Sequence, residues 1–359
     1  MNEQLRQYLQ MAVEQHASDV FIVAGAPVCM KLGGKVTAVG EQKNLPPETS
    51  ALLEELYRLA GRSMDMLERT GDDDYSFAMP GLARFRVNAY RQRGSLAAVI
   101  RVVAFEIPDW QERRIPESII KLSEITKGMV LFTGTAGSGK STTQACIIDR
   151  INHSRPCHII TLEDPIEYLY RNDRSIVSQR EIAIDSVDYP AALRACLRQA
   201  PDVIQLGEMR DLPTIRAAMT AAETGHLVFA TLHTRGAVNS IDRIVDAFPA
   251  EQQDQIRIQL SSVLRTVVSQ CLLPDTLGGR VPAFEIMHMN TAIRNLIRER
   301  KNHQIDNVIS TGSQEGMIPM DRYVLRLYED GIIARETALD FVENPQVLNR
   351  PSGSGFHKY

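Results

Sequence analysis

The chain has 359 residues, of which 44% are hydrophobic and 23% are charged, and its formal net charge at neutral pH is −4. This length suits two domains, and the weak negative charge argues against a general binder of nucleic acid or other polyanions. No segment approaches the roughly 18 uninterrupted apolar residues of a membrane span, and no basic and apolar signal peptide opens the sequence. The cysteines form no C-x-x-C spacing, which predicts free thiols in a reducing compartment rather than a structural zinc site.

Residues 1–103 predict a mixed α+β domain with an antiparallel sheet. An amphipathic helix is expected over 2–16, and Gly33-Gly34 is typical of a hairpin turn between two short strands. The remaining predicted elements are strands at 18–23, 28–32, 35–39, 74–78, 83–90 and 95–103, and helices at 46–60 and 63–70.

Residues 104–118 contain two prolines and no sustained periodicity, which predicts a linker. From 119 to 289 the pattern changes, because wholly apolar runs alternate with helical segments. That alternation predicts a parallel sheet covered on both faces. The predicted strands are 129–132, 158–162, 203–206 and 227–231, with a further strand near 281–287.

After residue 290 the sequence predicts a helical region that extends to 345. Its expected helices are 291–300, 303–311, 320–330 and 335–342. Residues 351–359 are rich in glycine and serine, and a disordered tail is predicted over 346–359.

Between the strand at 129–132 and the helix that follows lies the string Gly-Thr-Ala-Gly-Ser-Gly-Lys-Ser, which matches the phosphate-binding loop G-x-x-x-x-G-K-[ST]. Such a loop directs backbone N–H groups and a positive helix N-terminus at an anion. Lys140 is expected to reach the β- and γ-phosphates of ATP, and Ser141 to bind Mg²⁺. The alternative is a glycine-rich turn without a ligand. The nucleotide contacts predicted here are Gly134, Thr135, Ala136, Gly137, Ser138, Gly139, Lys140, Ser141 and Thr142.

Two acidic segments follow apolar strands, where ligands bind in open α/β sheets. Glu163 is the candidate for polarising the attacking water, with Asp164 and Glu167 as metal ligands or as groups that orient it. Glu208 closes the strand at 203–206 and is expected to approach Mg²⁺ through its water shell. The alternative for the first segment is an acidic cluster that balances a helix dipole behind Pro165.

A histidine and two arginines complete the set of candidates. His233 ends the strand at 227–231 and is expected to sense the γ-phosphate, although a histidine at a strand end is commonly structural. Arg86 and Arg101 belong to a group of arginines on predicted strands of the first domain. They are either a solvated surface or arginine fingers, and a finger supplied by a neighbouring subunit implies a ring.

Several strings resemble the secretion ATPase superfamily and, within it, the family of type IV pilus retraction ATPases. The similarity covers about residues 2–345, and segment 292–299 resembles a motif typical of retraction motors. The strings are the phosphate loop and the segments 17–19, 83–89, 161–167, 206–211, 220–234 and 292–299.

The resemblance implies a PAS-like N-terminal domain, a RecA-like ATPase core and a homohexameric ring that binds ATP and Mg²⁺. It places Glu163 at the catalytic glutamate, Glu208 in the Walker B segment, and His226 and His233 in the His box, with His226 among the nucleotide contacts. Arg86 and Arg101 match arginines that reach the γ-phosphate. The implied function is pilus retraction at the cytoplasmic face of the inner membrane, through a membrane platform protein and without nucleic acid.

Three departures from the family pattern remove no catalytic group. Thr135-Ala136 replace Pro-Thr, Phe21 stands where histidine is common, and Gln205 replaces an apolar residue inside a predicted strand. The buried amide of Gln205 is unexpected because it needs hydrogen-bond partners.

Other functions remain open from the sequence. A pilus assembly or type II secretion ATPase commonly carries an extra N-terminal domain and a tetracysteine zinc site, neither of which is found here. An auxiliary retraction paralogue, a nucleotide-gated scaffold with little hydrolysis and a nucleic-acid motor are further alternatives. The combination of Lys140, Glu163 and Glu208 opposes the scaffold, and the net charge opposes the nucleic-acid motor.

Overall fold

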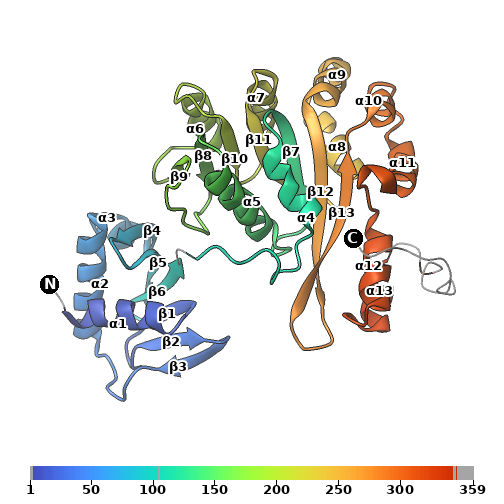
Figure 1. Cartoon of the computed structure of the whole chain (residues 1–359). Coiled ribbons are helices and arrows are strands. Elements are labelled where there is room, and N and C mark those ends of the chain that lie inside the picture. The colour runs from blue at the N-terminus through green and yellow to red at the C-terminus, as the bar shows by residue number, and fades with distance from the viewer. Residues whose placement is uncertain (1–2, 104–105, 343–344, 346–359) are drawn as a thin grey trace. The chain divides into compact units, whose positions relative to one another are not determined.

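The computed structural model describes residues 3–103, 106–342 and 345, so the predicted disordered tail at 346–359 lies outside the described residues. The chain divides into two compact units (Figure 1). The first runs to Glu106 and includes Glu167–Arg171, and the second comprises Ile107–Ile166 and the residues from Asn172 onward.

The first unit is built on a six-stranded antiparallel sheet in the order β3-β2-β1-β6-β5-β4. The sequence forms such a sheet because buried residues alternate along its strands, as Phe85 and Val87 do on β5. Leu53 and Leu56 of α2 pack on the buried face. The elements are α1 (Glu3–Glu14), β1 (Asp19–Ile22), β2 (Cys29–Leu32), β3 (Lys35–Ala38), α2 (Pro46–Ala60), α3 (Asp65–Thr70), β4 (Asp72–Met79), β5 (Ala83–Gln92) and β6 (Ser95–Val103).

The second unit contains a seven-stranded sheet in the order β13-β12-β7-β11-β10-β8-β9, in which every pairing except β12 with β13 is parallel. The parallel sheet predicted from the apolar runs is therefore present. Its strands are β7 (Gly128–Thr133), β8 (His158–Glu163), β9 (Ile176–Glu181), β10 (Val203–Leu206), β11 (Leu227–Leu232), β12 (Leu264–Pro274) and β13 (Arg280–His288).

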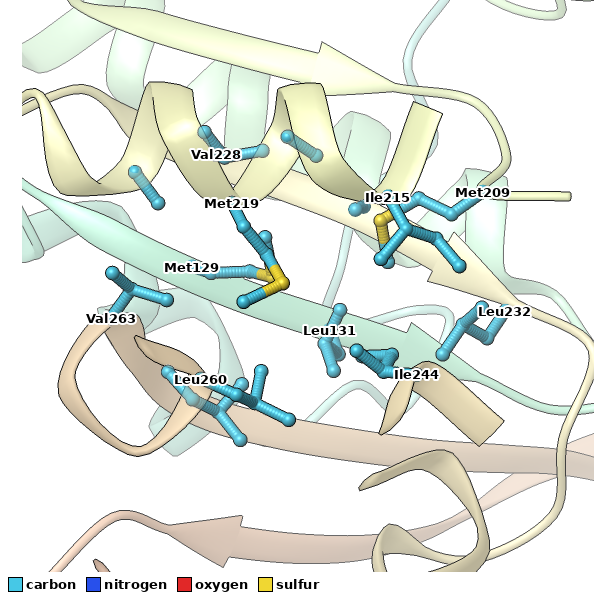
Figure 2. Packing of buried hydrophobic residues seen from close by; sticks show 14 of the residues in the cluster. Met129, Leu131, Met209, Ile215, Met219, Val228, Leu232, Ile244, Leu260 and Val263 are labelled. Carbon is cyan, nitrogen blue, oxygen red and sulfur yellow. The ribbon is translucent and has the colours of Figure 1, made fainter. Parts of the chain in front are cut away.

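Helices cover both faces of this sheet, as Figure 1 shows. Met129 and Leu131 of β7 point into the larger core, where they meet residues of α7, α8 and α9 such as Met219, Ile244 and Leu260 (Figure 2). The helices of the second unit are α4 (Glu117–Ile120), α5 (Lys140–Ser154), α6 (Tyr189–Cys196), α7 (Leu212–Glu223), α8 (Ala237–Asp246), α9 (Gln253–Val263), α10 (Thr291–Arg298), α11 (Ile305–Thr311), α12 (Met320–Glu329) and α13 (Arg335–Phe341), with short 3₁₀ turns η1 (Lys121–Glu124), η2 (Ala250–Gln252), η3 (Asn302–Gln304) and η4 (Ser313–Glu315).

Two strands were absent from the sequence prediction. β9 reads Ile-Val-Ser-Gln-Arg-Glu and lies at the edge of the sheet, so its composition lacks the apolar run of a central strand. β12 is apolar and lies between β7 and β13. β12 begins directly after helix α9, so the sequence shows one long apolar stretch in which the start of the strand cannot be recognised.

The predicted linker is not a free spacer over its whole length, because the second unit begins at Ile107. Ile115 is buried, and the Cys146 thiol of α5 donates a hydrogen bond to the Pro108 carbonyl at 3.2 Å. Residues 107–118 therefore pack with the second unit. Residues 104–105 are outside the described part of the chain.

Replacing Leu131 with alanine should lower the free energy of unfolding by about 2–5 kcal/mol, because truncating a fully buried side chain on β7, an interior strand of the sheet, would leave a cavity. Chemical denaturation measures this loss. Leu277→Ala is the matched control, since Leu277 is 88% exposed and should change stability by less than about 0.5 kcal/mol. Equal losses in both variants would contradict the assigned core.

Candidate functional site

The loop between β7 and α5 depends on glycine for conformation and for space. Gly134 and Gly139 have φ values of 139° and 89°, in the region that favours glycine. A Cβ at Gly134 would also overlap the carbonyl oxygen of Gln270, and one at Gly139 would lie 2.8 Å from its side-chain Nε2. The loop is therefore folded tightly against β12.

The side chains around this loop provide hydrogen-bonding groups that could bind a phosphate. Lys140 is 7% exposed, and its Nζ donates to the carbonyls of Gly134 and Thr135 at 2.7 and 2.9 Å. The hydroxyls of Thr133 and Ser138 are buried, and neither has a hydrogen-bond partner among the described residues. With the N-terminus of α5, these groups fit a nucleotide phosphate and its metal ion.

The remaining predicted loop contacts surround this centre. Thr135, Ala136 and Gly137 are exposed, whereas Ser141 and Thr142 are half-buried in the first turn of α5. The next residue, Thr143, donates to the Gln270 Oε1 at 2.9 Å and so fixes α5 against β12.

Glu163 ends β8 and is buried, with 7% of its surface exposed. The Thr161 hydroxyl donates to its Oε1 at 2.6 Å, and Gln179 Nε2 of β9 donates to the same oxygen at 3.2 Å. These neutral donors hold the carboxylate in one orientation. Asp164 and Glu167, predicted to hold the metal through water or to orient Glu163, are both exposed.

Glu208 follows β10 and is shared by two basic side chains. Arg210 Nε donates to its Oε2 at 2.7 Å, and His233 Nε2 lies 3.3 Å from its Oε1. The hydrogen bond to Glu208 is the main reason that the pKa of Arg210 is raised above its ordinary value. The structure therefore brings Glu208 and His233 together.

Arg210 had no assigned role in the sequence interpretation. The only local indication of its contact with Glu208 is that Arg210 follows two residues later, in Glu-Met-Arg. The contact itself forms because the loop brings both side chains to the same side.

His226 lies at the other end of β11, and its backbone carbonyl accepts a hydrogen bond from the Gly128 N–H at the start of β7. Its Nδ1 lies 2.9 Å from the Ala221 carbonyl and 3.1 Å from the Thr224 hydroxyl. The phosphate loop begins at the opposite end of β7. Within one chain β11 therefore separates His226 from the edge of the sheet that carries the phosphate loop, and its contact with a nucleotide stays a prediction.

Arg86 and Arg101 belong to the first unit and lie opposite each other on β5 and β6. They line a cavity of about 250 Å³ together with Asp19 and Asp74. Arg101 Nε donates to Asp19 Oδ1 at 3.1 Å, which partly balances the two neighbouring positive charges.

The unexpected amide of Gln205 has a partner in Gln144 of α5. Both side chains are buried, and Gln205 Nε2 donates to Gln144 Oε1 at 3.4 Å. Gln205 Oε1 and Gln144 Nε2 have no partner among the described residues. The pair connects the helix after the phosphate loop to β10, the strand that precedes Glu208.

The sequence matches the type II/IV secretion system protein family over residues 1–318. It is 42% identical over 346 residues to the type IV pilus retraction ATPase PilT of Pseudomonas aeruginosa, covering 95% of this chain and 99% of that protein. A twitching motility protein of Neisseria gonorrhoeae is 47% identical over 277 residues, which cover 77% of this chain and 74% of that one. Among solved structures, the pilus retraction motor PilT with bound ADP is similar with a TM-score of 0.87 at 43% identity, over 96% of this chain and 98% of that one.

The Gln144–Gln205 pair predicts strongly non-additive effects on stability. Gln144→Leu or Gln205→Leu alone should lower the free energy of unfolding by about 1–3 kcal/mol, because each leaves the other buried amide without its partner. The double substitution should be nearly neutral, since both polar groups are then replaced by apolar side chains. Urea denaturation of the four proteins measures the coupling, and simple additivity would show that the amides do not interact.

Proposed function

The chain belongs to the type II/IV secretion system protein family, and from this premise we propose that it is a motor ATPase that drives retraction of type IV pili. The observation that carries the proposal is the similarity to a retraction ATPase over nearly the whole length of both chains. The phosphate loop, with its required glycines and its buried lysine, supplies the nucleotide site that such a motor needs.

In this proposal the terminal phosphates lie on the backbone N–H groups of the loop, and Lys140 exchanges its carbonyl partners for phosphate oxygens. Ser141 and Glu208 would hold Mg²⁺, with the second carboxylate acting through water. The ion would neutralise charge on the phosphates when bound. His233, which lies beside Glu208, would couple the state of that carboxylate to the terminal phosphate.

Glu163 is the proposed general base. Both oxygens of Glu208 already have basic partners, Arg210 and His233. Glu163 accepts hydrogen bonds from the side chains of Thr161 and Gln179, which orient it. It would take a proton from the water that attacks the γ-phosphorus, as ADP leaves with the broken bond's electron pair.

The assembly is proposed from the same family relationship. We infer a PAS-like domain at 1–103, a RecA-like core at 119–289 and a homohexamer in which Arg86 and Arg101 reach a γ-phosphate. Such a ring would act on a platform protein at the cytoplasmic face of the inner membrane, without binding nucleic acid. Among the described residues, no helix is both long and apolar enough to cross a bilayer.

Glu163→Gln should retain ATP binding and lower kcat by on the order of 10²–10⁴, because the amide cannot accept the proton from water. Lys140→Ala, the companion variant, should lose both nucleotide binding and turnover. Phosphate release and calorimetric binding measure the two effects. If the wild type shows no turnover above that of Glu163→Gln, the scaffold alternative is favoured. If the wild type hydrolyses ATP and Glu163→Gln does so at the same rate, another residue is the general base.

Leu296→Ala should leave ATP turnover within about twofold while stopping pilus retraction, because α10 lies in the segment that resembles the retraction motif. Leu296 is only half-buried against the core, so its truncation should leave the fold intact. Asn295→Ala on the exposed side of the same helix is the control. Retraction is measured by fluorescence imaging of labelled pili, and full retraction by Leu296→Ala would assign that side chain to packing alone.

A further inference from the structure

Tyr189 is a polar side chain at the catalytic edge that none of the roles above uses. It is the first residue of α6, and Asp188 caps the helix by accepting a hydrogen bond from the Ala191 N–H at 2.7 Å. Its ring packs against the larger core of the second unit. The cap and the packed ring together fix the direction of the hydroxyl.

The hydroxyl of Tyr189 lies against Gly207, between the ends of β8 and β10. A Cβ on Gly207 would be 2.6 Å from this oxygen and 3.2 Å from the Leu162 carbonyl oxygen. Gly207 donates its N–H to that carbonyl at 2.8 Å, and its φ is outside the left-handed region. Space for the hydroxyl, rather than backbone conformation, therefore requires glycine here.

The surroundings keep this hydroxyl protonated. Burial raises the pKa of Tyr189, and the negative charges of Asp164, Glu208 and Glu163 raise it further, while Arg210 lowers it. At neutral pH the side chain is thus an O–H donor next to acceptor-only carboxylates. Among the residues that the structure describes, no hydrogen bond to this hydroxyl is formed.

We propose that Tyr189 is a positioning residue, whose hydroxyl donates a hydrogen bond to water held between Glu163 and Glu208 in the nucleotide-loaded site. The inference rests on the proposed ATPase function, whereas the location of the Tyr189 hydroxyl against Gly207 is independent of that function. Phenylalanine would fill the same space and pack against the same core, so packing alone does not require the oxygen.

The test compares Tyr189→Phe with the wild type, using Mg²⁺ and the non-hydrolysable analogue AMPPNP as the probe. Addition of Mg·AMPPNP to the wild type should shift the near-ultraviolet tyrosine band, because the hydroxyl gains an acceptor, and this shift should vanish in Tyr189→Phe. With ATP, the variant should lose about tenfold in kcat at unchanged KM, because the hydroxyl orients the water rather than the nucleotide; a tenfold loss corresponds to about one hydrogen bond.

Tyr323→Phe is the matched control, because Tyr323 is a similarly half-buried tyrosine that packs on Phe284 in another cluster. It should keep both the spectral shift and the rate. A spectral shift that persists in Tyr189→Phe, or a wild type that binds Mg·AMPPNP without a shift, overturns the proposal. A wild type that shows the shift but never hydrolyses ATP would refute the ATPase function and leave the contact of Tyr189 supported.

Discussion

Parallel pairing of β7, β11, β10 and β8 is the constraint on which the rest of the site depends. In parallel strands the carboxyl ends meet at one edge, and the register pairs Thr133 with Leu232 and Leu206 with Leu162. The phosphate loop, His233, Glu208 and Glu163 each follow or end one of these strands. Strand pairing alone therefore brings residues that are far apart in the sequence to one edge of the sheet.

This arrangement places polar groups where apolar residues would be more stable. Glu163, Gln144 and Gln205 are all buried beside the sheet. Each is matched by at least one hydrogen-bond partner, which limits the cost of removing it from water. The apolar layer on the other face of the strands, around Leu131, supplies the burial that offsets the remaining cost.

The negative charge of Glu208 at this edge is balanced by basic side chains next to it. Arg210 and His233 face the two oxygens of Glu208, and the side chains of Thr161 and Gln179 donate to one oxygen of Glu163. Two carboxylates at neighbouring strand ends thereby have different surroundings, which is the physical basis for giving them different roles. The Tyr189 hydroxyl lies against Gly207, between the ends of the two strands.

The sequence alone determined the phosphate loop, the parallel strands β7, β8, β10 and β11 and the positions of Glu163 and Glu208, because each depends on local spacing or on the composition of a single run. It also showed that Gln205 was out of place. Only the tertiary structure decided its partner Gln144, the pairing of Glu208 with Arg210 and the separation of His226 from the loop. These depend on strand register and helix packing, which join residues too distant in the chain for any local pattern to connect.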